Sequence, residues 1–344
     1  MQHTTHSSQR LRHLDWLRGL AALLVVLVHT GVTGIVMDPL QLPFELGHFA
    51  VCLFFAISGF VITLSVDNTP LPVFWVRRFL RLYPSYWLSL LAIVLLAMLS
   101  VARPFSPQFD QTPLLTVAGN ITMLQRAVGI DDLLPVYWSL FPEMLFYGLI
   151  SILIMLRVFR NSVPVALGGI AVAALLSDVL PRLGYQTPDE PIYLAIMVTG
   201  MVLYRTSQGH VARRTAFGVA TLCVLMIGLS CASSSFILAR AAAIPFFALM
   251  LHVKPGSSVL VFLGRISYPL YLTHELVIAV IHTNLFWLDI LLWISVSILV
   301  AWASYRAIER PMMVLARRLS SSARAIPGAR APLQQLARML KRSL

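Results

Sequence analysis

The stretch DWLRGLAALLVVLVHT, residues 15–30, decides how the chain folds. Its apolar centre is typical of a membrane helix, yet the stretch contains Arg18 and His29, eleven positions apart. On an α-helix that turns by about 100° and rises by about 1.5 Å per residue, the two side chains share a face and lie roughly 16 Å apart along the axis. Ionisable groups inside a membrane are costly, so we interpret the pair as functional. For His29 alone, a polar contact that helps a bundle pack would explain the residue equally well.

Composition places the rest of the chain in the membrane as well. Of 344 residues, 58% are hydrophobic and only 12% are charged, and the mean hydropathy is +0.81. Several apolar runs approach the roughly 20 residues that cross a bilayer as a helix. We therefore predict an all-α, polytopic membrane protein with about ten transmembrane helices. The predicted spans are residues 16–33, 47–65, 85–101, 139–156, 163–180, 191–204, 215–231, 235–251, 267–283 and 287–306.

The distribution of basic residues predicts that both termini are cytoplasmic. If the N-terminus lies inside, most loop Arg and Lys residues fall on the cytoplasmic side, and the outer loops hold only Arg103, Arg126 and Arg182. This is the asymmetry that the positive-inside rule requires. The net charge of +12 then reflects topology rather than nucleic-acid binding. We expect a multi-pass protein of the cell inner membrane.

The expected organisation has three parts. Residues 1–12 form a cytoplasmic N-terminal segment, residues 13–311 the transmembrane domain, and residues 312–344 a basic tail without acidic residues. Such a tail is expected to be disordered or to lie on anionic lipid in the cytoplasm. Cys52, Cys223 and Cys231 fall in apolar runs and are expected to be small buried residues rather than disulfide partners.

Basic and acidic residues with helical spacing mark two further candidate sites. Arg78 and Arg81, next to Arg77 in the loop expected before the third span, are three positions apart and would form a fork suited to phosphate oxygens. A plain topology signal is the alternative. Ser139, Glu143 and Tyr147 are spaced four apart and share one helical face.

Glu143 is expected just inside the membrane near its outer surface. A buried carboxylate needs a partner, and the candidates are Arg18, His29 and Arg240; a purely structural ion pair is the alternative. His274, in the ninth span, suits either substrate orientation or a hydrogen bond within the bundle. Because no His-Glu-x-x-His, Cys-x-x-Cys or carboxylate-rich loop occurs, we expect no metal site.

Taken together and in this order, these motifs resemble those of the membrane acyltransferase-3 family. The matching residues are Arg18 and His29 for its Arg-x10-His pattern, Phe54-Phe55 with Ser58-Gly59-Phe60, the Arg78 and Arg81 pair, Trp138-Ser139-Leu140 with Glu143 and Phe146-Tyr147, Ile266-Ser267-Tyr268 with Tyr271-Leu272 and His274, and residues 305–311. The resemblance covers residues 12–311. One departure is Cys52, which stands where many members carry an acid.

The resemblance implies that the chain is an O-acyltransferase, in the stand-alone form without a fused soluble hydrolase-like domain. The donor would be cytoplasmic acyl-CoA, and acetyl-CoA above all, used as a co-substrate rather than a bound cofactor. The acceptor would be a hydroxyl of a surface polysaccharide, a lipid-linked sugar or another glycan. Arg77, Arg78 and Arg81 would hold the phosphates of the donor, and Trp138, Tyr147, Tyr271 and His274 would contact substrate.

His29 is the expected general base, with Glu143 fixing the tautomer of its imidazole, and Arg18 is counted in the same catalytic group. A covalent acyl-enzyme on His29 or Ser139 is the alternative route. The buried charges would also suit a second class of protein, a proton-coupled transporter of a small solute. The oligomeric state is left open.

Overall fold

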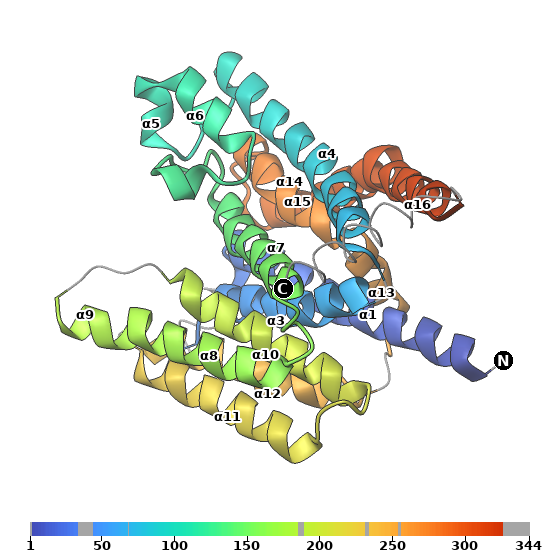
Figure 1. The fold of residues 1–344 in the computed structure, drawn as a ribbon. Helices are drawn as coiled ribbons and strands as arrows, with labels where there is room; N and C mark the ends of the chain where they lie inside the picture. The colour runs from blue at the N-terminus through green and yellow to red at the C-terminus, as the bar shows by residue number, and fades with distance from the viewer. Residues whose placement is uncertain are drawn as a thin grey trace.

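The described part of the chain is helical throughout. The computed structural model describes residues 2–33, 44–67, 69–184, 189–230, 234–253 and 256–325, with no β-strand among them (Figure 1). The α-helices are α1 (Gln2–His29), α3 (Leu46–Asp67), α4 (Leu71–Met98), α5 (Pro107–Gln111), α6 (Pro113–Asn120), α7 (Leu140–Met155), α8 (Ser162–Ala174), α9 (Leu180–Arg182), α10 (Glu190–Ser207), α11 (Arg213–Leu229), α12 (Ser234–Met250), α13 (Ser258–Arg265), α14 (Ser267–Val280), α15 (Phe286–Ser304) and α16 (Arg310–Ala325). Two 3₁₀ turns, η1 (Gln125–Val128) and η2 (Pro135–Ser139), and two π-helical turns, η3 (Leu175–Val179) and η4 (Tyr305–Glu309), join them.

Long apolar helices confirm that the protein belongs in a membrane. Within the described residues, five helical segments are long and apolar enough to cross a bilayer. They are Leu46–Asp67, Leu71–Met98, Pro135–Met155, Ser162–Arg182 and Phe286–Ser320. A helix overlaps each of the ten predicted ranges, while ten crossings and cytoplasmic termini stay predictions.

The third predicted span begins too late. Helix α4 begins at Leu71, with Pro72 in its first turn, so Arg77, Arg78 and Arg81 lie on the helix rather than in a loop. Proline is favoured at this end of a helix because its missing N–H needs no partner there. Three arginines close together are typical of a loop, which is why the sequence predicted one, but here they belong to the first three turns of α4.

The predicted boundary at residue 311 falls inside a helix. Helix α15, the π-helical turn η4 and α16 follow one another without a break from Phe286 to Ala325. Of the two alternatives expected for the tail, disorder does not hold for residues 312–325, which are helical, while a position on anionic lipid stays a prediction; residues 326–344 lie outside the described part. Arg77 joins α16 to α4, because its Nε donates to Ser320 Oγ at 3.0 Å.

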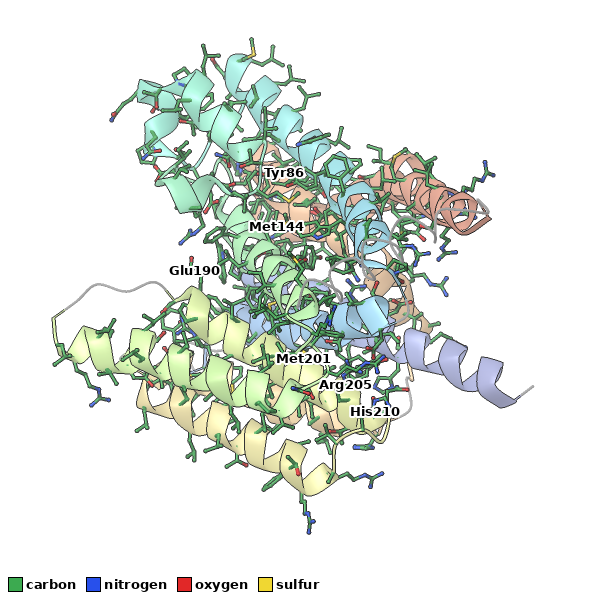
Figure 2. The ribbon with its side chains drawn as sticks, in the orientation of Figure 1. Tyr86, Met144, Glu190, Met201, Arg205 and His210 are labelled. Atoms are coloured by element: carbon green, nitrogen blue, oxygen red, sulfur yellow. The ribbon has the colours of Figure 1, made fainter. Side chains whose placement is uncertain are left out.

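The helices form two groups on either side of a central layer. Figure 1 shows α8, α10, α11 and α12 stacked on one side, with α4, α14, α15 and α16 on the other and α1, α3 and α7 between them. Helix α3 packs on α10 and α12, and α1 packs on α3, α13 and α14. At one end of the α3–α10 contact, Arg205 donates to Asp67 at 2.7 Å (Figure 2).

Glycines bring the backbones of the central helices into direct contact. A Cβ on Gly59 of α3 would overlap the carbonyl of Met197 in α10, and a Cβ on Gly200 would overlap the carbonyl of Ala56. Gly19 of α1 meets α13 in the same way. Small residues at helix crossings permit this close approach inside membranes. Among the cysteines, Cys52 and Cys223 are free and buried as expected, and Cys231 lies outside the described residues.

We predict that Gly59→Val destabilises the protein far more than Gly218→Val, a matched control on α11 where a Cβ meets nothing within 4 Å. Overpacking at Gly59 should cost at least about 1–3 kcal/mol, whereas the control should stay within about 0.5 kcal/mol of wild type. Thermal unfolding in detergent, followed by size-exclusion chromatography, measures the difference. Equal melting temperatures for the two variants would show that the α3–α10 contact is not as close as described.

Candidate active site

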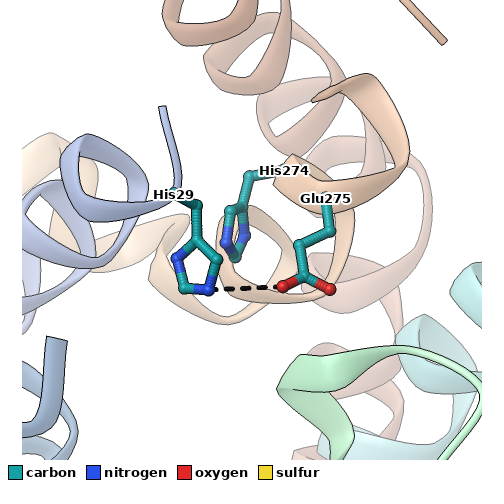
Figure 3. A group of neighbouring side chains, drawn as sticks. All are labelled: His29, His274 and Glu275. Carbon is teal, nitrogen blue, oxygen red and sulfur yellow. Dashed lines mark ion pairs between the residues drawn. The ribbon is translucent and has the colours of Figure 1, made fainter. Parts of the chain in front are cut away.

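The first and fourteenth helices meet at an acid–base pair. His29, the last residue of α1, places Nε2 at 3.3 Å from Oε1 of Glu275 on α14 (Figure 3). The His29 ring also meets the His274 ring edge-on, with centroids 4.9 Å apart. The partner predicted for His29 was Glu143, and that prediction is wrong.

Backbone carbonyls fix both imidazole rings. Nδ1 of His29 lies 2.8 Å from the carbonyl of Val25, and Nδ1 of His274 lies 3.0 Å from that of Leu270. A carbonyl oxygen only accepts, so each Nδ1 carries the hydrogen and each Nε2 is left for other partners. His29 Nε2 and Glu275 Oε1 then require a proton between them for their contact to be attractive.

Glu143 belongs to a second group of side chains, toward the other end of α1. Tyr147 Oη donates to Glu143 Oε1 at 2.6 Å, and the carboxylate lies within electrostatic range of Arg18 and Arg78. Glu143 sits in the first turn of α7, but its side chain points into the bundle rather than toward His29. Arg240, the third partner considered, is paired with Asp189 at 2.6 Å.

Three arginines from two helices gather around this carboxylate. Arg81 acts electrostatically on both Arg18 and Arg78, and Asp15 and Glu309 are further acids in the group. The guanidinium of Arg78 is buried over the rings of Phe74 and Tyr147, at 5.4 and 5.6 Å from their centroids. Arg78 and Arg81 share a face as predicted, and the structure adds Arg18. We call Arg18, Arg78 and Arg81 the arginine cluster.

Arg77 and Tyr147 are placed differently from the expectation. Arg77 donates to Ser320 and, at 3.3 Å, to Thr69 Oγ1, so it is engaged with α16 rather than with the arginine cluster. Tyr147 is fully buried beside Arg78 and is not among the residues that line the cavity next to His29.

A cavity of about 1280 Å³ opens beside His29. Trp138 and Tyr271, both predicted to contact substrate, line it together with His48. Trp138 stands between His48 and Tyr193, with ring centroids 6.4 and 5.2 Å away. Apolar walls with a few convergent polar groups are typical of small-molecule sites.

Part of the cavity lining is polar. Arg126 bridges Asp132, at 3.1 Å, and Glu190, at 3.4 Å, and all three line the cavity. Glu190 begins α10 (Figure 2), so the bridge ties the segment before η2 to a helix of the other group. Asp131 and Glu45 are further acids on the lining. The cavity lining thus combines carboxylates and a guanidinium with aromatic side chains.

Ser139 lies close to the cavity but has no base beside it. Its Oγ is 2.7 Å from Tyr271 Oη and donates to the Val136 carbonyl at 3.2 Å. Tyr271 itself donates to that same carbonyl at 3.0 Å. No histidine or carboxylate of the described residues hydrogen-bonds Ser139, so the structure shows no group that would activate it as a nucleophile.

Glu275 is the candidate site residue that the sequence analysis missed. A carboxylate directly after His274, eight positions into an apolar helix, was the available signal, because intramembrane acids default to function. His274 was expected to contact substrate or to hydrogen-bond within the bundle; it is fully buried behind His29, bonds the Leu270 carbonyl and is not among the residues that line the cavity. One ligand atom each of His29, His274 and Glu275 lies within 4.8 Å of the others. The motif search that predicted no metal site could not find this group, because it spans two distant helices.

Comparison with known proteins identifies the family to which the chain belongs. The family model described as an acyltransferase domain, acyltransferase-3, matches residues 11–308, and the chain therefore belongs to that family of acyltransferases. A protein of Acidianus two-tailed virus that is named as an acetyltransferase, ORF330, is 25% identical over 294 residues, which are 80% of this chain and 86% of the viral protein. No solved structure matches the chain.

We predict that Glu275→Gln lowers the turnover number about 100-fold, whereas Glu143→Gln lowers it much less. The amide keeps the shape of Glu275 but cannot stabilise a charged imidazole, and a positioned acid–base group contributes about 10²–10⁴-fold. Turnover of purified, well-folded variants measures both effects. The reverse order would return Glu143 to the role of His29 partner.

Proposed function

We propose that the protein moves an acyl group, acetyl above all, from cytoplasmic acyl-CoA to a hydroxyl of a carbohydrate at the cell inner membrane. The acceptor would be a surface polysaccharide or a lipid-linked sugar. The observation that carries the proposal is the His29–Glu275 pair, of which His29 lines a cavity together with aromatic and acidic side chains. Membership of an acyltransferase family favours this reaction over solute transport.

The proposed chemistry uses His29 as a general base. Nε2 of His29 takes the proton of the acceptor hydroxyl while the hydroxyl oxygen attacks the thioester carbonyl. The carbon–sulfur bond breaks, and the CoA thiolate leaves and takes up the proton. Glu275 lies beside this same Nε2, whereas the acid of a catalytic triad lies beside Nδ1. With His29 neutral and Glu275 ionised the contact between them is no longer attractive, so Nε2 is free to take the proton, and the carboxylate then stabilises the imidazolium that forms. Nδ1 stays bound to Val25 throughout, which holds the ring in one orientation.

Direct transfer from donor to acceptor is the simpler route for this site. An acyl-enzyme on Ser139 would need a base beside Oγ, and the partners of Oγ are Tyr271 and the Val136 carbonyl. A single step also needs donor and acceptor in one cavity at the same time, and the volume of about 1280 Å³ leaves room for a sugar and an acyl thioester. We therefore assign no covalent role to Ser139.

The arginine cluster is our proposed site for the phosphates of acyl-CoA. Guanidinium groups bind phosphate oxygens in forked, charge-assisted pairs. Arg18 lies roughly 16 Å from His29 along α1, a separation that suits a ligand with a long arm between its phosphates and its thioester. If α1 enters from the cytoplasm, as the positive-inside rule predicts, the cluster lies nearer the cytoplasm than His29 does.

The cavity is our proposed acceptor site. The half-buried ring of Trp138 lines the cavity and offers its exposed part as an apolar surface to the C–H face of a sugar. Asp131, Asp132 and other carboxylates across the cavity can accept hydrogen bonds from its hydroxyls. With ten spans and cytoplasmic termini, this cavity would face the outer side of the membrane, where a lipid-linked sugar or a surface polysaccharide is presented.

We predict that His29→Ala abolishes transfer while the protein still inserts and folds. The measurement is product mass after incubating membranes with labelled acetyl-CoA and candidate glycans. His210→Ala is the matched control, because His210 is exposed and remote from the cavity (Figure 2). More than a few per cent of wild-type turnover in a well-folded His29→Ala protein would refute the general-base role.

We predict that Arg81→Ala raises the KM for acyl-CoA about 10- to 100-fold and leaves the KM for the acceptor nearly unchanged. Losing one hydrogen bond to a charged group costs about 1.5–3 kcal/mol. Arg77→Ala is the matched control on the same helix, because Arg77 is engaged with α16. An equal effect of the two substitutions would reduce the arginines to topology signals.

A further inference from the structure

The group formed by His29, His274 and Glu275 has the chemistry of a metal site. We propose that these three side chains bind Zn²⁺, and that the bound ion inhibits acyl transfer by occupying Nε2 of His29. Binding of the ion is independent of the proposed function, while the inhibition rests on His29 being the base of that reaction. Two imidazoles and one carboxylate form one of the ligand sets that zinc takes in enzymes.

The geometry brings one donor atom from each residue to a common point. His29 Nε2 and Glu275 Oε1 are already 3.3 Å apart, and all three donor atoms lie within 4.8 Å of one another (Figure 3). Zinc binds imidazole nitrogen and carboxylate oxygen at about 2.0–2.2 Å, which separates tetrahedral ligand atoms by roughly 3.4 Å. Small side-chain rotations suffice to close the site.

The second observation is a pair of buried atoms that have no partner. His274 is fully buried, and its Nε2 makes no hydrogen bond within the described residues. Oε2 of Glu275 is likewise a buried atom without a hydrogen-bond partner in that part of the chain, although the Val136 backbone interacts with the same carboxyl group. Buried polar atoms without partners are uncommon and call for an explanation such as an ion. Both belong to the same three-residue group, which a cation would satisfy.

The backbone bonds of the two rings prepare them for an ion. Metal-binding histidines almost always donate the second ring N–H to a carbonyl or a carboxylate, which fixes the tautomer and leaves the other nitrogen free to coordinate. His29 donates to Val25 and His274 to Leu270 in this way. The two bonds lie one turn back along different helices, so both rings are oriented by rigid elements.

The exposure of the site explains how an ion enters and why it would inhibit. The side chain of His29 is 35% exposed and lines the cavity, whereas that of Glu275 is 11% exposed. An ion can therefore arrive from the cavity, and its fourth position would face the cavity too. With Nε2 coordinated, His29 has no lone pair left for the proton of an acceptor hydroxyl.

The test measures zinc binding and activity separately on the full-length protein. Zinc binding is measured by isothermal titration calorimetry with ZnSO₄ on protein purified through a tag that contains no histidine. Every sample also has His3 and His6 replaced by alanine, so that these N-terminal histidines cannot bind the ion. Wild type, His274→Ala, Glu275→Gln and the control His210→Ala are compared. Co²⁺ serves as an optical probe of a tetrahedral site. Acetyl transfer is then followed with and without ZnSO₄.

We expect one zinc per chain in wild type and in His210→Ala. Binding should weaken in His274→Ala and Glu275→Gln by more than the roughly 10- to 100-fold that loss of a supporting hydrogen-bond partner costs. Zinc should inhibit wild-type transfer at the concentrations at which it binds, and a chelator should restore activity. Equal zinc binding by all four proteins, or none by wild type, would overturn the site. Zinc binding at this site without inhibition would overturn the proposed inhibition but not the site. Absence of any transfer activity in wild type would count against the proposed function, while the titration still decides whether the zinc site exists.

Discussion

The contact between α1 and α13 is the constraint on which the active site depends. Gly19 meets the carbonyl of Leu260, and Gly264 meets the carbonyl of Asp15, so neither position has room for a side chain. Because α13 continues into α14 after a single residue, Ile266, this contact fixes where α14 lies along α1. It thereby sets His29 against His274 and Glu275. Dispersion and close backbone approach supply the attraction, since apolar burial gains little between helices in lipid.

The charged residues inside the bundle form two levels on the same helix. Near the end of α1, His29 and Glu275 form an acid–base pair beside the cavity. Roughly 16 Å earlier, Arg18 joins Arg78, Arg81 and the carboxylates of Glu143 and Glu309. The π-helical turn η4 carries Glu309 into this group, and such turns recur at functional sites. Each level also keeps a buried carboxylate oxygen without a hydrogen-bond partner among the described residues, Oε2 of Glu275 in the first and Oε2 of Glu309 in the second.

Sequence reasoning found what lies within one helix and missed what packing brings together. Arg18 and His29 were recognised because their spacing along α1 fixes their common face. Glu275 was missed because its partner, His29, is on another helix. The position of Glu275 next to His274 in the sequence does not reveal which helix packs against α14. Glu143 was assigned to His29 because both were expected at the same depth in the membrane. The depth of Glu143 is hard to predict, since it lies in the first turn of a helix that follows a long irregular segment. The early start of α4 was missed because three arginines read as a loop.

The central claim is that His29 and Glu275 act as one unit. A double-mutant cycle on kcat/KM, built from His29→Ala, Glu275→Gln and the double variant, tests it most directly. Residues that act together are strongly non-additive, so the double variant should be no slower than His29→Ala alone. If instead the two losses multiply, as independent sites do, Glu275 acts elsewhere and the pairing of α1 with α14 is not the catalytic arrangement.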